Sequence, residues 1–223
     1  MQNPSAVPLW ERTVLRDTAG STLRPGGFAL TDRAVDLARI PSGSRVLDVG
    51  CGLGATVEHL RSEHGFDACG IDNSVRQLSE APGDLPLTLA EASCIPCADS
   101  FFDALFCECV LSLMPDQQKC ITEFSRILKK DGKLIITDLY QRGEGEETTD
   151  LKCSCASSPL DLNNTEKHLY ACGMHIAALE DHSKLLAELA ARLIFAGEPD
   201  FRLTGNCCRR PGYMLMIAEM NRF

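Results

Sequence analysis

A glycine-rich turn between an apolar run and a helical pattern is the feature that most constrains the fold of this chain. The segment from Arg45 to Gly54 reads Arg-Val-Leu-Asp-Val-Gly-Cys-Gly-Leu-Gly. Its first half is apolar and β-branched, which predicts a short strand buried on both faces. The glycines of its second half permit positive φ angles and admit a ligand where a Cβ atom would collide. A helical pattern begins at Ala55, and this strand, turn and helix are typical of doubly wound sheets that bind nucleotide-like ligands.

A carboxylate follows at the position where such folds bind a ribose. The next apolar run, Ala68 to Ile71, ends in Asp72, eighteen residues after Gly54. In doubly wound folds the acid at this strand end accepts hydrogen bonds from two ribose hydroxyls. A glycine pattern alone is weak evidence, because most chance matches are ordinary turns. With a strand before it, a helix after it and this acid, the pattern predicts a nucleoside-type ligand.

The glycine spacing narrows the kind of nucleoside. The pattern is Gly-x-Gly-x-Gly preceded by Asp48, and not the Gly-x-Gly-x-x-Gly of dinucleotide enzymes, so an NAD-type oxidoreductase is disfavoured. In this form the sequence resembles the class I S-adenosylmethionine (SAM) methyltransferases, specifically the broad type 11 group. The resemblance spans residues 30–140 and the last two predicted strands. It implies an α/β fold with a Rossmann-like, seven-stranded, mostly parallel sheet, helices on both faces and an antiparallel last strand, in agreement with the alternation of strands and helices.

The resemblance implies S-adenosyl-L-methionine as the cofactor and assigns its parts to residues of this chain. Asp48 would orient the amino group of the methionine part, and Asp72 would bind the ribose. Glu91-Ala92, directly after the third predicted strand, would meet the adenine. The cofactor-binding residues expected on this basis are Asp48, Gly50, Cys51, Gly52, Gly54, Asp72, Asn73, Glu91, Ala92 and Cys107.

One basic residue is a candidate partner for the SAM carboxylate. The segment from Thr31 to Ile40 has a helical apolar pattern, and Thr31 or Asp32 can cap its start. In the related methyltransferases this segment lies over the SAM pocket, which makes Arg33 a candidate. A solvated arginine on the helix surface is an equally good interpretation.

The residues that would act on the methyl acceptor are less well marked. The methyl group of SAM is already activated, so the enzyme mainly has to hold the acceptor in line with it, and no obligatory triad is needed. Cys107-Glu108 stands where members of the resembling family usually carry Ser-Asn, beside the expected methyl position. Tyr140, at the end of the fifth predicted strand, either lines the pocket or packs. We therefore expect a small-molecule acceptor and pocket candidates Cys107, Glu108 and Tyr140, with no catalytic residue assigned.

The chain has twelve cysteines, of which four fall in predicted loops where burial gives no reason for sulfur. Close thiol pairs bind soft ions or undergo oxidation. Cys94-x-x-Cys97 has the spacing of a metal or redox pair, but related proteins place apolar residues there, so core packing is expected. The soft-ion candidates in the loops are Cys153, Cys155, Cys207 and Cys208.

These thiols leave two alternatives open. The surroundings of Cys109-Val110 and of 138–140 resemble arsenite methyltransferases, although the spacing of the remaining cysteines does not match that group cleanly. The first alternative is therefore methylation of a thiol-bound metalloid such as arsenite. The second is a SAM-binding or metal-binding thiol protein without transfer activity.

Length and composition bound the remaining expectations. With 223 residues, the chain is expected to form a single domain, 1–223, with an N-terminal arm (1–30) and an insertion (141–175) as pocket covers. The net charge of −9 argues against a nucleic-acid groove, which needs basic residues. No apolar run approaches the ~18 residues of a membrane span, and the N-terminus has no secretory pattern. We expect a cytoplasmic protein, a monomer or a homodimer, with no nucleic-acid or membrane partner.

Overall fold

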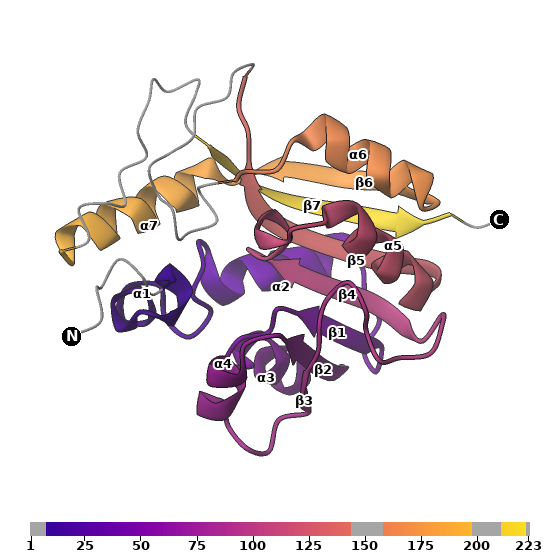
Figure 1. Cartoon of the computed structure of the whole chain (residues 1–223), viewed down its shortest axis with the longest axis horizontal. Helices are drawn as coiled ribbons and strands as arrows, with labels where there is room; N and C mark the ends of the chain where they lie inside the picture. The colour runs from indigo at the N-terminus through magenta and orange to yellow at the C-terminus, as the bar shows by residue number, and fades with distance from the viewer. Residues whose placement is uncertain (1–7, 144–157, 198–210, 222–223) are drawn as a thin grey trace.

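The computed structural model describes residues 8–143, 158–197 and 211–221, and strands and helices alternate along it (Figure 1). The strands are β1 (Arg45–Val49), β2 (Asp67–Asp72), β3 (Leu87–Leu89), β4 (Phe102–Glu108), β5 (Leu128–Tyr140), β6 (Met174–Asp181) and β7 (Gly212–Met220). The helices are α1 (Thr13–Ala19), α2 (Gly27–Ala38), α3 (Ala55–Ser62), α4 (Val75–Glu80), α5 (Gln117–Ile127), α6 (Leu162–Ala171) and α7 (Ser183–Phe195). Two short 3-10 helices are η2 (Leu9–Glu11) and η3 (Leu111–Leu113). Within these residues, no helix has the length and apolar character needed to cross a membrane.

The strands form one seven-stranded sheet in the order β3-β2-β1-β4-β5-β7-β6. Strands β1 to β5 run parallel to one another, and β7 runs antiparallel to both β5 and β6, as the sequence predicted. Val49 at the end of β1 pairs with Ile71 of β2 on one side and with Cys107 of β4 on the other. The carboxyl ends of the three central strands therefore meet at one edge, where ligands bind in open α/β sheets.

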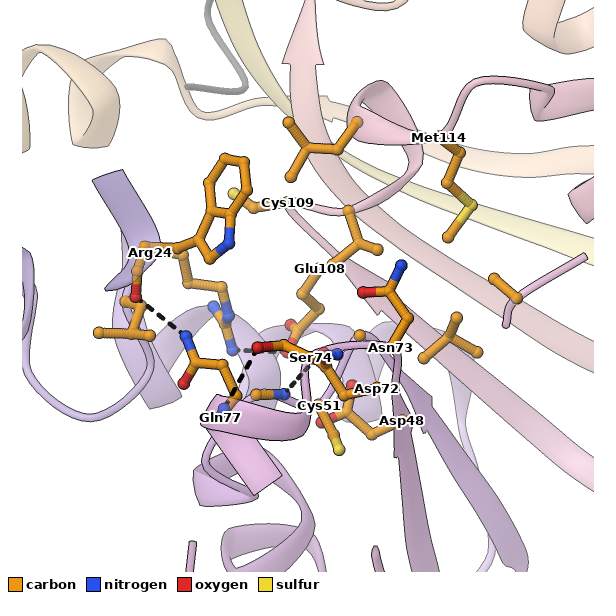
Figure 2. Close-up of a pocket in the computed structure, with 18 of the residues that line it drawn as sticks. Arg24, Asp48, Cys51, Asp72, Asn73, Ser74, Gln77, Glu108, Cys109 and Met114 are labelled. Carbon is orange, nitrogen blue, oxygen red and sulfur yellow. Dashed lines mark hydrogen bonds and ion pairs between the residues drawn. The ribbon is translucent and has the colours of Figure 1, made fainter. Parts of the chain in front are cut away.

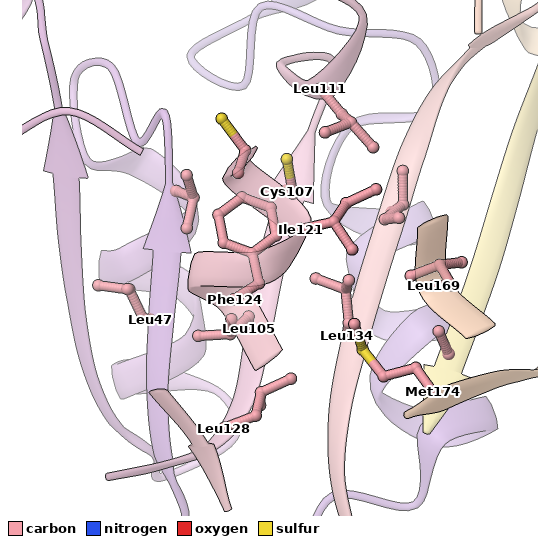
Figure 3. Packing of buried hydrophobic residues seen from close by; sticks show 14 of the residues in the cluster. Leu47, Leu105, Cys107, Leu111, Ile121, Phe124, Leu128, Leu134, Leu169 and Met174 are labelled. Carbon is pink, nitrogen blue, oxygen red and sulfur yellow. The ribbon is translucent and has the colours of Figure 1, made fainter. Parts of the chain in front are cut away.

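Helices cover the two faces of the sheet and bury a separate apolar core on each. The α5 side, shown in Figure 3, packs Ile121 and Phe124 against Leu105 of β4 and Leu134 of β5, and all four side chains are fully buried. Burial of a side chain of this size stabilises the fold by about 1.5–3 kcal/mol. On the opposite face, α2, α3 and α7 pack against the same strands.

The N-terminal segment is fixed to the fold by a third apolar cluster. Leu9 of η2 and Leu15 of α1 pack against Leu189 and Leu193 of α7, so α1 lies beside α7 in Figure 1. Arg192 of α7 also donates a hydrogen bond to a backbone carbonyl near the end of α1, at 3.2 Å. This packing holds residues 8–25 over the carboxyl edge of the central strands.

Helix α2 begins earlier than its apolar pattern predicted. Its first residue is Gly27, and Gly26 precedes it in the left-handed conformation with φ of 82°. Thr31 therefore lies inside the helix, where it is fully buried and accepts a hydrogen bond from Arg24. The prediction that Thr31 or Asp32 caps the helix was wrong, because both lie inside it and the glycine pair supplies the turn from which the helix starts.

Candidate functional site

A cavity of about 560 Å³ lies at the carboxyl ends of β1, β2 and β4. Pockets that bind small molecules and cofactors have volumes of roughly 300–1,000 Å³. The glycine turn and the ends of the three strands form one side, and residues 21–25 with η2 and α7 form the cover. The side formed by the turn and the strand ends is called the floor of the cavity below, and Figure 2 shows the polar side chains gathered on it. Of the residues predicted for the site, the cavity is lined by Asp48, Gly50, Cys51, Gly52, Asp72, Asn73, Glu91, Ala92 and Glu108.

Two glycines of the turn have different roles. The amides of Gly50 and Cys51 donate to the carbonyl of Ile71 at 2.8 and 3.0 Å, which ties the turn to β2. A Cβ atom on Gly50 would lie 2.4 Å from Val110, so this glycine is required by packing. A Cβ atom on Gly52 would meet nothing closer than the Gln77 side chain at 3.8 Å, so its open side faces the cavity. Gly52 is therefore the position at which a ligand can approach the backbone closely.

Asp72 is held in one orientation at the edge of the cavity. Its Oδ2 accepts a hydrogen bond from the Gly52 amide at 2.8 Å, and its Oδ1 accepts one from the Ser74 amide at 2.7 Å. Ser74 in turn caps α4 by accepting from the amide of Gln77 at 3.2 Å. Each carboxylate oxygen has a second lone pair, so Asp72 remains able to accept hydrogen bonds from a ligand.

A buried ion pair closes the floor between β4 and the N-terminal segment. Nη2 of Arg24 lies 2.7 Å from Oε2 of Glu108, and Thr56 of α3 donates to the same oxygen at 3.3 Å. Burial raises the pKa of Glu108, and the positive charge of Arg24 opposes that rise. Asp48 lies in the same cluster, and burial together with the charge of Glu108 raises its pKa well above the usual range. The cluster therefore contains one positive charge, that of Arg24, and two buried acids, Asp48 and Glu108. Ionising both acids at once is costly, because each negative charge disfavours the other.

Two buried oxygen atoms in the cavity wall have no hydrogen-bond partner among the described residues. They are Oε1 of Glu108 and Oε1 of Gln77, and both residues line the cavity. The amide nitrogen of Gln77 is already used, since it donates to the carbonyl of Trp10 at 3.0 Å. A buried acceptor left without a partner costs about 1–3 kcal/mol. Both atoms are hydrogen-bond acceptors, so this wall is suited to a ligand that presents hydrogen-bond donors, such as an ammonium group or hydroxyls.

Three predicted site residues are not among the described residues that line the cavity. Cys107 is completely buried in the α5-side core, and burial raises the pKa of its thiol well above the usual range. Gly54 packs against Leu85 and against Leu87 of β3, where a Cβ atom would lie 2.8 and 2.9 Å from their side chains. Tyr140 does not line the cavity and accepts a hydrogen bond from Nε of Arg142 at 3.3 Å. All three are therefore used in packing in this structure, which for Tyr140 agrees with the packing alternative, and a contact of Cys107 or Gly54 with the cofactor stays a prediction.

The arginine at the site is a different one from the arginine that the sequence suggested. Arg33 is half exposed and pairs with Glu180 of β6 at 2.5 Å, and it does not appear in the described cavity wall. Arg24, with 2% of its side chain exposed, lines the cavity instead. It precedes a Pro-Gly-Gly turn and has no periodic neighbours, so the sequence carries no signal that would have selected it.

The insertion and the cysteines are described only in part. Cys153, Cys155, Cys207 and Cys208 lie outside the described residues, so their role as soft-ion ligands stays a prediction. The described residues from 158 to 175 include α6, which packs against α5 and β6 and does not contribute to the cavity wall. Cys97 packs beside the α5-side core, as expected, whereas Cys94 is exposed in a turn.

Comparisons with known proteins agree with this architecture. The profile of a family described as "Methyltransferase domain" matches residues 47–136. The phosphoethanolamine N-methyltransferase of Triticum aestivum is 26% identical over 177 residues, which cover 75% of this chain and 35% of that protein. This chain thus spans about half or less of the length of curated relatives such as this one.

Two solved structures illustrate the likeness of fold. The [4+2]-cyclase SpnF superposes with a TM-score of 0.79 at 20% identity, covering 94% of this chain and 92% of that chain. Phosphoethanolamine N-methyltransferase 2 of Haemonchus contortus, in complex with phosphomonomethylethanolamine and S-adenosylhomocysteine, superposes with a TM-score of 0.77 at 20% identity, covering 94% of this chain and 57% of that chain. At such identities these two structures establish the shared fold alone.

Proposed function

Because this chain belongs, through residues 47–136, to the class I SAM-dependent methyltransferases, we propose that it transfers the methyl group of SAM to a small-molecule acceptor. The observation that carries the proposal is the cavity at the carboxyl edge of the sheet, with Asp72 oriented by two backbone amides at its rim. The cavity is covered by the N-terminal segment, so an acceptor small enough to share it with the cofactor is favoured over a macromolecule.

The residues of the cavity fit the chemical groups of SAM. Asp72 keeps acceptor capacity for the ribose hydroxyls, and the open side of Gly52 leaves room beside the backbone. Arg24 and the unpartnered oxygen of Glu108 offer one positive and one negative group, which complement the carboxylate and the ammonium of an α-amino acid. We propose Glu91 and Ala92, which also line the cavity, as the adenine contacts.

The chain itself contributes binding, orientation and exclusion of water. When bound, SAM supplies an activated methyl group that passes to the acceptor by in-line displacement. Correct orientation of the two reactants supplies several kcal/mol of the rate enhancement, and no general acid or base is obligatory. We propose that apolar side chains of the lining from η3, from the residue that follows it and from α7 hold the acceptor. These side chains are Leu113, Met114, Leu186 and Leu189.

The thiol-bound metalloid is the weaker candidate for the acceptor. Among the described cysteines, Cys51, Cys109 and Cys120 line the cavity. Burial raises the pKa of Cys120 to about 11 and raises that of Cys51 further, which leaves both as neutral thiols at physiological pH. Soft ions bind thiolates, so these positions favour structural roles. The loop cysteines remain to be tested as serine variants.

The rival from another class is a protein of this fold that binds SAM and transfers no methyl group. The likeness to a [4+2]-cyclase is a reminder that one fold hosts several activities. The discriminating experiment incubates the protein with methyl-labelled SAM and a cell extract, then separates small molecules from protein and nucleic acid. Label in the small-molecule fraction supports the proposal, and label on macromolecules contradicts the acceptor class. Tight binding of S-adenosylhomocysteine with no transfer to any fraction supports the rival.

A cytoplasmic location and a monomeric or homodimeric state stay predictions of the sequence. Both concern the protein as a whole, and the curated relatives are longer than the part that this chain matches.

A further inference from the structure

Three potential metal ligands converge on the outer surface between α2 and α3, away from the cavity. They are Asp32 of α2, His59 of α3 and His64 in the turn after α3. The Nε2 atoms of the two histidines lie 2.6 and 2.8 Å from the same oxygen, Oδ1 of Asp32. The three ligand atoms all lie within 4.8 Å of one another. None of these residues belongs to the described cavity wall, so the cluster is separate from the proposed active site.

The two imidazole rings are held in place by aromatic neighbours. Phe28 stacks on His59 with ring centroids 4.2 Å apart and an angle of 12° between the planes. Phe66 stacks on His64 with centroids 5.6 Å apart, and Phe66 itself is buried. The side chains of His59 and His64 are 14% and 20% exposed, whereas that of Asp32 is 45% exposed. The nitrogen ligands are therefore preorganised, and the carboxylate is the group that is free to adjust.

We propose that Asp32, His59 and His64 form a binding site for a divalent transition-metal ion, with Zn²⁺ as the best match. Imidazole nitrogens and a carboxylate oxygen are ordinary zinc ligands, and three protein ligands leave one tetrahedral position for water. Bonds of about 2.0–2.2 Å separate tetrahedral ligand atoms by about 3.4 Å, so Asp32 would withdraw by roughly 0.6–0.8 Å from the two histidine nitrogens. Its greater exposure allows this movement.

The alternative to a metal site is that His59 and His64 simply form hydrogen bonds with Asp32, and this alternative explains the arrangement less completely. Both histidines present the same ring atom to one carboxylate oxygen, and the described residues supply no hydrogen bond to the other oxygen of Asp32. A bound ion would use both imidazoles and the carboxylate at once. The chain also carries a net charge of −9, which favours cations over anions at such a surface.

The position of the site gives the ion a structural consequence. Helix α2 starts directly after the segment that carries Arg24, and α3 carries Thr56, which donates to Glu108. An ion bound between α2 and α3 would link the two helices that support the buried ion pair of Arg24 and Glu108. The inference does not depend on methyl transfer, because it concerns a surface outside the cavity.

The experiment uses the full chain with Cys153, Cys155, Cys207 and Cys208 replaced by serine, so that loop thiols cannot bind the probe. After chelator treatment and dialysis, Zn²⁺ is titrated by calorimetry, and Co²⁺ is added as a visible-absorption probe of coordination. We expect one Zn²⁺ per chain, the spectrum of low-coordinate Co²⁺, and a higher melting temperature with Zn²⁺.

The double variant Asp32→Asn/His64→Gln should bind Zn²⁺ at least 100-fold more weakly, because it loses two of three ligands. His175→Gln is the matched control, since His175 is an exposed histidine on β6 that contacts Asn221 and lies outside the cluster. Circular dichroism and S-adenosylhomocysteine binding establish that each variant is folded. Equal Zn²⁺ affinity in the double variant and the parent, or no Zn²⁺ binding by the folded parent, would overturn the proposal.

Discussion

Nη2 of Arg24 lies 2.7 Å from Oε2 of Glu108, and 2% and 3% of the two side chains are exposed. This pair joins the segment before α2 to the end of β4, at the floor of the cavity. Removing two charges from water is costly, and only good geometry with further hydrogen bonds offsets that cost. Arg24 also donates to the carbonyl of Gly27 at 2.9 Å and to Thr31, while Thr56 donates to Glu108. The pair is therefore part of a network that positions the cover of the cavity.

Loss of one partner of this pair should be more harmful than loss of both charges. Arg24→Met leaves Glu108 buried without its counter-charge, and we expect the free energy of unfolding to fall by about 3–5 kcal/mol at pH 8. The loss should shrink at lower pH, because an unpaired Glu108 takes up a proton. Arg24→Met/Glu108→Gln should regain part of the stability. Urea unfolding of the three proteins measures this, and equal stability of the single and double variants would contradict it.

Asp72→Asn should weaken cofactor binding without unfolding the protein. The amide offers one acceptor oxygen in place of two, and its NH₂ group faces a backbone amide donor. We expect the Kd for S-adenosylhomocysteine, measured by calorimetry, to rise at least tenfold. Asp67→Asn, at the opposite end of the same strand, is the matched control and should bind normally. Similar affinities for the two variants would remove Asp72 from the site.

Alanine substitutions at Gly50 and Gly52 should distinguish the glycine that is needed for packing from the one that is needed for ligand binding. Gly52→Ala places a methyl group in open space at a φ of 54°, so we expect a stability cost of about 1–2 kcal/mol. The same methyl group should reduce affinity for S-adenosylhomocysteine at least tenfold, because it occupies the ligand's approach. Gly50→Ala meets Val110 at 2.4 Å and should cost more stability, about 2–5 kcal/mol. Thermal unfolding and calorimetry test both, and full binding by Gly52→Ala would contradict the assignment.

Asp138 should make stability depend on pH. It is fully buried below η3, and its carboxylate accepts hydrogen bonds from Ser112 and from the Leu139 amide. Burial outweighs these bonds and raises the pKa of Asp138 to about 6, against ~3.9 for an unfolded chain. Between these values the native state keeps a proton that the unfolded state has lost, so stability falls as the pH rises through this window.

The expected size of this effect is about 2 kcal/mol between pH 4 and pH 7. Asp138→Asn has no group to titrate at this position, although it loses one acceptor and should be less stable throughout. The difference in unfolding free energy between wild type and this variant, measured in urea across that range, should decrease as the pH rises. A difference that does not change with pH would show that Asp138 ionises normally in the fold.

Local sequence patterns determined the sheet, the turn and the acid at its rim. Strand β1, the glycine turn, helix α3 and Asp72 follow from the periodicity and from the conformational freedom of glycine, which are properties of consecutive residues. The amphipathic pattern of α5 and the antiparallel last strand were likewise predictable, the second from the family resemblance.

Tertiary structure alone decided which side chains share the cavity. Arg24 and Glu108 are far apart in the chain, and no local pattern links them. Adjacent residues of β4 also lie in different environments, since the side chain of Cys107 is in the core and that of Glu108 lines the cavity. A strand buried on both faces has no polar alternation from which its orientation could be derived. The sequence by itself therefore determined the backbone that meets a ligand, whereas the packing of distant segments determined the charges around it, because burial and ion pairing depend on which surfaces the fold brings together.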